Sequence, residues 1–131
     1  MKRNIFLLAA LPLLLPLYAG AEMPSTIRIE MSEFAFRPAT IHLTIGHPLR
    51  LVLVNRGQIA HQFQTGYVSA LPVVLVSGAL HEEAPGLDVV RLDPGGTARL
   101  EFLARKKGDF EFFCGIEGHR EAGMHGILEV R

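Results

Sequence analysis

The stretch Thr26–Asn55 reads TIRIEMSEFAFRPATIHLTIGHPLRLVLVN, and apolar side chains alternate with polar ones three times within it. The alternating apolar positions are Ile27, Ile29 and Met31, then Ile41, Leu43 and Ile45, then Leu49, Leu51 and Leu53. A period of two residues is typical of a strand with one face buried. Turn residues at Pro38 and at 46–48 separate the three runs, and turn residues at 55–57 end the third. This part of the chain therefore predicts three strands joined by turns.

The same alternation returns toward the C-terminus. Strand-like segments cover 87–92, 97–103, 110–113 and 126–130, with turn residues at 93–96 and 106–109. Between Gln64 and these segments the pattern loosens over about 25 residues, which predicts either a functional loop or additional short structure. Six to eight short strands and no convincing helical stretch predict an all-β fold, an antiparallel β-sandwich of Greek-key type.

The N-terminus has the three parts of a secretory signal peptide. Lys2 and Arg3 precede the uncharged apolar run Ile5–Tyr18, and the small residues Ala19–Ala21 follow it. We expect cleavage after Ala21, which makes residues 1–21 a signal peptide and leaves 22–131 as a single domain. The alternative is an uncleaved anchor, but the apolar run is shorter than the roughly 20 residues that span a bilayer. The expected location is therefore the periplasm or the outer face of the cell membrane, peripheral to the membrane at most.

Composition narrows the class of protein further. The chain has 131 residues, 13 basic and 13 acidic side chains, and one Cys. A balanced charge provides no electrostatic basis for binding nucleic acid, which needs an excess of Lys and Arg. One Cys cannot form an internal disulfide, and an unpaired thiol is a liability in the oxidising environment of an exported protein. We therefore expect Cys114 to be protected by a bound partner.

The segment 112–126 reads FFCGIEGHREAGMHG and carries the chemistry. It places Cys114, His119 and Met124 at Cys-x4-His-x4-Met on one Gly-rich loop between two strands. A blue copper site uses two imidazoles and one thiolate in a trigonal plane, with a weak axial Met. The loop lacks one imidazole, and His61, just after the third alternating run, is placed to supply it. Glycines let such a loop adopt backbone conformations that bring its side chains to one point.

Each of these residues also has a simpler interpretation. Cys114 alone is compatible with a small buried hydrophobic residue, and Met124 with a core filler. Other histidines compete with His61, namely His42, His47, His81 and His125. The first three are expected to be solvated surface residues, because they fall on a polar strand face, in a turn and in the loosely patterned interval. His125 directly follows Met124 and is expected to point outward near the site.

The chain from residue 22 onward resembles the cupredoxins, the small blue copper family of plastocyanin and azurin. The similar residues are Phe34-Ala35-Phe36-Arg37-Pro38, Ile41, Gly46, Asn55, Asp93-Pro94-Gly95, the segment 108–114, and the segment 119–130. The resemblance implies one type 1 copper ion, cycling between Cu(I) and Cu(II), with His61, Cys114 and His119 as strong ligands and Met124 as the axial ligand. Gln62 is a departure, because azurin and plastocyanin have an Asn there that ties the ligand strand to the Cys loop.

The expected function is single-electron transfer without catalysis, because protein side chains fill every strong copper position. The resemblance implies that His119 presents its ring edge through an apolar patch, with Ile116, Ala122 and Gly123 as candidates. Transient redox proteins of cytochrome or oxidase type would dock there on a monomer. A multicopper oxidase needs a second, His-rich cluster, and a binuclear copper centre needs a second Cys; this chain has neither. A copper carrier or copper-resistance protein remains an alternative, because it uses the same ligand types.

Overall fold

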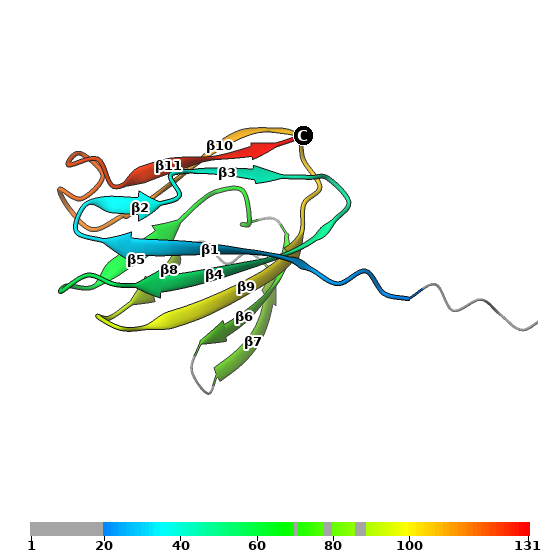
Figure 1. Cartoon of the computed structure of the whole chain (residues 1–131), viewed down its shortest axis with the longest axis horizontal. Coiled ribbons are helices and arrows are strands. Elements are labelled where there is room, and N and C mark those ends of the chain that lie inside the picture. The colour runs from blue at the N-terminus through cyan, green and yellow to red at the C-terminus, as the bar shows by residue number, and fades with distance from the viewer. Residues whose placement is uncertain (1–19, 70, 78–79, 86–88) are drawn as a thin grey trace, which may run out of the picture.

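The alternating segments form strands, as predicted, in the computed structural model, which describes residues 20–69, 71–77, 80–85 and 89–131. The strands in this part of the chain are β1 (Ser25–Ser32), β2 (Ala35–Arg37), β3 (Thr40–Leu43), β4 (Pro48–Asn55), β5 (His61–Gln64), β6 (Pro72–Ser77), β7 (Leu80–Pro85), β8 (Val89–Leu92), β9 (Thr97–Leu103), β10 (Gly108–Phe113) and β11 (His125–Val130). They form two sheets that face each other, which confirms the predicted all-β sandwich (Figure 1).

The sheets are mixed rather than antiparallel. Strand order is β2-β1-β4-β9-β6-β7 in one sheet and β3-β11-β10-β5-β8 in the other. The pairs β1/β4 and β3/β11 are parallel, and the other pairs are antiparallel. The parallel pairs arise because the chain leaves the first sheet after β2, adds β3 to the second sheet, and returns as β4 beside β1. Alternation of side chains reports which face of a strand is buried, but not the direction of its neighbour.

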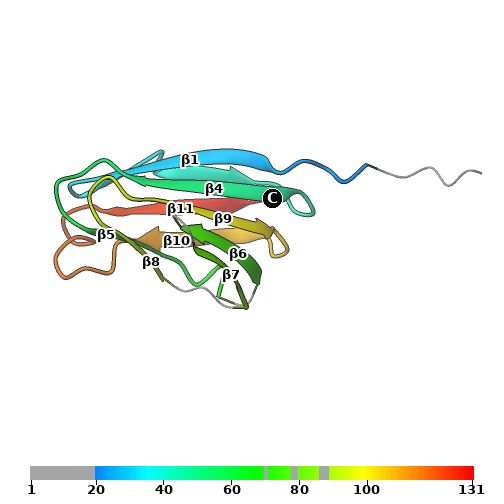
Figure 2. The same cartoon turned by 90° about the horizontal axis from the view of Figure 1, so that it is seen from below.

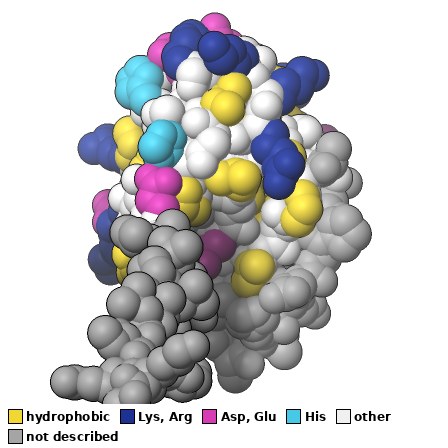
Figure 3. All heavy atoms as spheres, turned by 90° about the vertical axis from the view of Figure 1, so that its right-hand side faces the viewer, with side chains coloured by type: hydrophobic (Ala, Val, Ile, Leu, Met, Phe, Trp, Pro, Cys, Tyr) yellow, Lys and Arg dark blue, Asp and Glu magenta, His cyan; other side chains and the backbone are white. Residues whose placement is uncertain are grey.

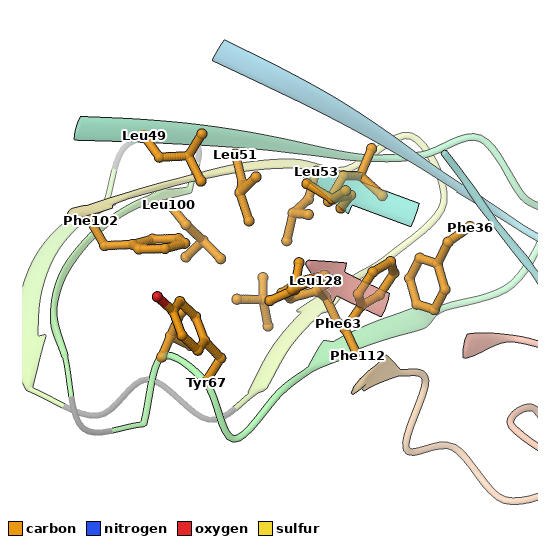
Figure 4. Close-up of a cluster of buried hydrophobic side chains, with 14 of the residues drawn as sticks. Phe36, Leu49, Leu51, Leu53, Phe63, Tyr67, Leu100, Phe102, Phe112 and Leu128 are labelled. Atoms are coloured by element: carbon orange, nitrogen blue, oxygen red, sulfur yellow. The ribbon is translucent and has the colours of Figure 1, made fainter. Parts of the chain in front are cut away.

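The core lies between the two sheets, whose strands run along the same long direction (Figure 2). The inward residues of the alternating runs are fully or almost fully buried, including Leu51, Leu53, Leu100, Phe63, Phe112 and Leu128. At one end of the core the rings of Phe36, Phe63 and Phe112 meet, with centroids 5.1 to 6.2 Å apart (Figure 4). Burying one such side chain contributes about 1.5–3 kcal/mol, so this cluster stabilises that end of the core.

The loosely patterned interval contains additional strands, one of the two predicted alternatives. Strands β6 and β7 form a hairpin that extends the first sheet beyond β9. Before it, Tyr67 is buried against Phe110, and its hydroxyl accepts hydrogen bonds from the backbone N–H groups of Arg105 and Lys106. The predicted strand over 87–92 corresponds to β8, whose first described residue is Val89.

Three connections gather at one end of the sandwich: β1–β2, β4–β5 and β10–β11 (Figure 1). The C-terminus lies toward the opposite end. Residues 1–19, which contain nearly all of the predicted signal peptide, lie outside the described residues, so the division at residue 21 stays a prediction. The described part of the chain includes no helix long and apolar enough to cross a membrane.

Candidate metal centre

His61, Cys114 and His119 meet at the end of the sandwich where the three connections gather. One ligand atom of each side chain lies within 4.8 Å of the others, the single such group of His, Cys or acidic residues found in the described residues. His61 is the first residue of β5, Cys114 directly follows β10, and His119 lies in the β10–β11 loop. His61 and Cys114 are fully buried, and His119 is 8% exposed. Residues far apart in the sequence thus form one buried group of nitrogen and sulfur donors.

Met124 is fully buried at the end of the same loop and is tied to the two other loop residues through the main chain. Its N–H donates to the carbonyl of His119 over 3.0 Å, and its own carbonyl accepts from the N–H of Cys114 over 3.0 Å. The N–H of His119 in turn donates to the carbonyl of Ile116. The segment Cys114–Met124 therefore forms a loop whose two ends are joined by a main-chain hydrogen bond.

Glycine is required within this loop at Gly118 and Gly123. Their φ angles are +79° and +109°, in the region that side chains with a Cβ rarely adopt. The Gly-rich sequence predicts unusual backbone conformations in this loop, and these two glycines adopt them.

The sulfur of Cys114 has two polar neighbours. The backbone N–H of Gln62 donates to Sγ over 3.3 Å, and Nδ1 of His119 lies 3.4 Å from Sγ. The first contact joins the start of β5 to the end of β10. A donor that points at sulfur stabilises the negative charge of a thiolate, the form of Cys that binds a metal.

His61 is buried without a hydrogen-bond partner for either ring nitrogen in the described part of the chain. Buried polar atoms of this kind are rare and indicate a missing ligand or a functional role. Burial lowers the pKa of His61 below its ordinary value, and the nearby His119 lowers it further. A neutral imidazole is the form that binds a metal. The donor set of two imidazoles, one thiol and one thioether therefore fits a single type 1 copper ion.

The β1–β2 turn contacts both imidazoles, a feature that the sequence analysis missed. Oε1 of Glu33 lies 3.8 Å from Nε2 of His61. The ring of Phe34 packs edge-on against the ring of His119, with centroids 5.2 Å apart and planes at 89°. Phe34 has a φ of +60°. The backbone N–H of Gln58 donates to the Glu33 carboxylate and holds the pKa of this group below its usual value.

Asn55 organises the connection that leads to His61. Its side-chain amide donates to the carbonyls of Ile59 and Leu92 over 2.8 and 3.0 Å, and its Oδ1 accepts from the N–H of Gly57 over 2.8 Å. The residue is fully buried. All three polar positions of the amide are used for bonds to the main chain, so Asn55 fixes the path of the chain from β4 to β5.

The β10–β11 loop is also held from its outer side. Arg120, which follows His119, forms a bidentate ion pair with Glu111 of β10. Its guanidinium lies over the ring of Phe113, 4.3 Å from the ring centroid. These contacts keep the loop against β10 at the position where His119 approaches the surface.

The other histidines lie apart from the candidate ligands. His42 and His47 are exposed and pair with Glu129 and Glu22 over 3.0 and 2.6 Å, which confirms the expected surface positions. Figure 3, which views the end opposite the candidate centre, shows two His side chains on the surface near acidic ones. His125 is exposed on β11, as expected. The side chain of His81 lies outside the described residues.

Of the expected patch residues, Ala122 and Gly123 are exposed and Ile116 is half-buried. Phe34 at 44% and Ile59 at 43% exposure add larger apolar surface from the β1–β2 and β4–β5 connections. Neither Phe34 nor Ile59 is among the patch residues expected from the sequence.

Comparison with known proteins agrees with this geometry. The chain matches the family model of the cupredoxin-like domain over residues 4–128. It is 35% identical over 117 residues to the copper-resistant cuproprotein CopI of Rubrivivax gelatinosus, covering 86% of this chain and 70% of that protein. It is 25% identical over 146 residues to the copper-resistant cuproprotein CopI of Pseudomonas aeruginosa, covering 86% of this chain and 79% of the relative.

The fold has a counterpart among solved structures. Reduced auracyanin from the photosynthetic bacterium Roseiflexus castenholzii superimposes with a TM-score of 0.59 at 19% identity, covering 83% of this chain and 99% of that one. At this identity the likeness supports the fold alone. Together with the family match over nearly the whole sequence, it confirms the resemblance found in the sequence: this chain belongs to the cupredoxin-like domain family.

Proposed function

We propose that this protein is an exported type 1 copper protein that carries single electrons between redox partners. One copper ion would be held by His61, Cys114 and His119, with Met124 as the weak axial ligand. The observation that supports this proposal most directly is the buried group of His, Cys and His donors within 4.8 Å of one another. When bound, copper supplies one-electron chemistry by alternating between Cu(I) and Cu(II).

The contribution of the chain is to hold these donors in fixed positions. The sandwich sets His61, and the hydrogen-bonded loop sets the three others, so little rearrangement is required of the protein when the charge of the site changes. With four protein side chains as ligands, no strong position is left for a substrate. We therefore propose electron transfer rather than an enzymatic reaction.

His119 is the candidate ligand nearest the surface, because it is 8% exposed whereas the other three are fully buried. A redox partner approaching this end would contact Phe34, which packs on the His119 ring. Transient electron-transfer complexes bury less than about 1,200 Å² in total. We propose that a monomer of this protein uses the apolar surface around His119 for such brief contacts with cytochrome-type or oxidase-type proteins.

The visible spectrum tests the copper centre. The exported protein should show intense orange-red absorption with Cu(II), because charge transfer from a Cys thiolate to copper produces it. Cys114→Ser should abolish this absorption, while His42→Ala, which removes an exposed histidine at the other end, should leave it unchanged. A colourless wild-type protein would contradict the proposal, and colour retained in Cys114→Ser would contradict the assignment of the thiolate.

A second candidate function is copper resistance, favoured by the names of the two relatives, both copper-resistant cuproproteins. A carrier of this kind would bind Cu(I) preferentially and exchange it with other proteins. Two measurements separate the candidates: reversible cycling of the coloured form with a redox protein supports electron transfer, whereas rapid loss of Cu(I) to a competing chelator supports a carrier. Cell fractionation would test the proposed periplasmic location.

A further inference from the structure

The turn between β1 and β2 brings one carboxylate to the buried imidazole of His61. Oε1 of Glu33 lies 3.8 Å from Nε2 of the ring. Both ring nitrogens of His61 lack a hydrogen-bond partner among the described residues, and Nε2 is the one that faces this carboxylate. The ring is fully buried, whereas the Glu33 side chain is 39% exposed. The carboxylate therefore lies between the solvent and the Nε2 edge of the buried imidazole.

The local structure is shaped to permit this approach. The N–H of Gln58 donates to Oε1 of Glu33 and fixes the carboxylate. Gly57 lies between the two side chains: a Cβ there would be 2.6 Å from Oε1 of Glu33 and 2.8 Å from Nε2 of His61. Any residue other than glycine would push the carboxylate and the ring apart. In the β4–β5 connection, Gln58 thus binds the Glu33 carboxylate, and Gly57 leaves space for it beside His61.

Among the ionisable side chains of the described residues, His61 is the one that Glu33 approaches. No Lys or Arg forms an ion pair with Glu33 in the described part of the chain. Glu30, three residues earlier on β1, pairs instead with Arg28 at 3.2 Å and Arg56 at 3.6 Å. Glu30 at the end of β1 and Glu33 in the following turn therefore differ, because Glu30 pairs with arginines and Glu33 faces a candidate ligand.

Histidines that bind metals usually donate their other ring N–H to a carboxylate, a carbonyl or water, which fixes the tautomer and makes the ring a stronger ligand. We propose that Glu33 is the positioning residue of His61: its carboxylate accepts a hydrogen bond from the N–H at Nε2 and leaves Nδ1 to bind the metal. This inference rests on the proposed copper centre. The two atoms are 3.8 Å apart, longer than a hydrogen bond, so the proposal requires the flexible carboxylate to move closer to Nε2 when the metal is bound.

A second consequence concerns the balance between the two copper oxidation states. A carboxylate one imidazole ring away from the metal favours Cu(II) over Cu(I), because it places a negative charge near the more positive ion. Removing the charge should therefore raise the reduction potential. Loss of such a partner typically costs at least about tenfold in metal affinity. Because the lost charge stabilises Cu(II) more than Cu(I), we assign this loss to Cu(II), and a tenfold change in the ratio of Cu(II) to Cu(I) affinity equals about 59 mV for one electron.

The test compares Glu33→Gln with Glu30→Gln in the protein expressed from the whole sequence and purified after export. Glu33→Gln keeps the size of the side chain, so the variant should retain the orange-red absorption. The ratio of its Cu(II) affinity to its Cu(I) affinity should fall about tenfold, which voltammetry measures as a higher reduction potential. Glu30→Gln should leave both properties unchanged. Equal potentials for the two variants would overturn the proposal. A wild-type protein that never becomes coloured would instead overturn the copper centre itself.

The tautomer of His61 gives a readout that is independent of electron transfer. The same ligands accept Zn(II), and ¹⁵N NMR spectra of the zinc form distinguish a protonated Nε2 from a protonated Nδ1. We expect Nε2 to carry the proton, with its resonance shifted in Glu33→Gln and unchanged in Glu30→Gln. A metal bound through Nε2 would overturn the proposal.

Discussion

The backbone N–H of Gln62 lies 3.3 Å from Sγ of Cys114 and donates to it. In azurin and plastocyanin, an Asn at the matching position ties the ligand strand to the Cys loop, and the Gln in this chain left that tie unexplained. The structure has a main-chain contact at this position, which does not depend on the side chain of residue 62. Gln62 directly follows the candidate ligand His61, so its N–H links the strand that carries His61 to the sulfur of Cys114.

We predict that Gln62→Ala leaves the charge-transfer absorption and the reduction potential unchanged, because the donor is an N–H that alanine retains. Gln62→Pro removes that N–H and should lower the potential, since a thiolate without its donor is more negative and stabilises Cu(II). Voltammetry and visible spectroscopy check both variants, with circular dichroism to establish that the proline variant folds. A large shift in Gln62→Ala would show that the side chain contributes after all.

Gly57→Ala should destabilise the protein by about 1–3 kcal/mol, the usual cost of inserting a group into a packed site. The new methyl group would overlap with Glu33 and His61, which must move apart. Gly66→Ala is the matched control, because a Cβ at Gly66 meets nothing within 4 Å. Urea unfolding of the metal-free proteins measures both. Equal unfolding midpoints for the two variants would contradict the close approach at Gly57.

Asn55→Ala should cost about 3 kcal/mol of unfolding free energy. The substitution leaves the N–H of Gly57 and the carbonyls of Ile59 and Leu92 without their partner, at about 1 kcal/mol each. Because these bonds set the path into β5, weaker copper binding should accompany the loss. Gln58→Ala, at an exposed position of the same connection, is the control for both measurements. Unchanged stability in Asn55→Ala would mean that water replaces the amide.

The sequence predicted the strands with regular alternation and the loop that carries Cys114, His119 and Met124, because both depend on local spacing. It did not predict the parallel pairing of β1 with β4, since a side-chain period is the same whichever way the neighbouring strand runs. Glu33 and Phe34 were missed for a related reason. They lie in a turn, and their importance comes from the imidazoles that the fold places beside them.

The interval after Gln64 shows the same limit. Its loose pattern is compatible with a functional loop or with extra structure. The structure shows extra structure there, the strands β6 and β7. The lengths of β6 and β7 are ordinary and the two strands pair with each other, but the strand that joins them to the sheet is β9, about 20 residues further along the chain. Local sequence carries little information about such long-range pairing.

Tyr67→Phe tests whether this interval is anchored independently of the candidate metal centre. The Tyr67 hydroxyl accepts the N–H groups of Arg105 and Lys106 over 3.2 and 3.4 Å, and the ring is 6% exposed against Phe110. In Figure 4 Tyr67 lies at the opposite end of the core from Phe36, which belongs to the aromatic cluster beside the candidate centre.

Removing the hydroxyl leaves the two N–H groups without this acceptor, so Tyr67→Phe should lower the free energy of unfolding by about 1–2 kcal/mol. Because the ring and its packing are retained, the visible spectrum and the reduction potential of the copper form should not change. Ser69→Ala removes an exposed hydroxyl that bonds to the carbonyl of Gly66, and should change stability little. Urea unfolding followed by circular dichroism measures all three proteins. A spectral change in Tyr67→Phe would mean that the two ends of the core are coupled, because the substitution touches no residue of the candidate centre.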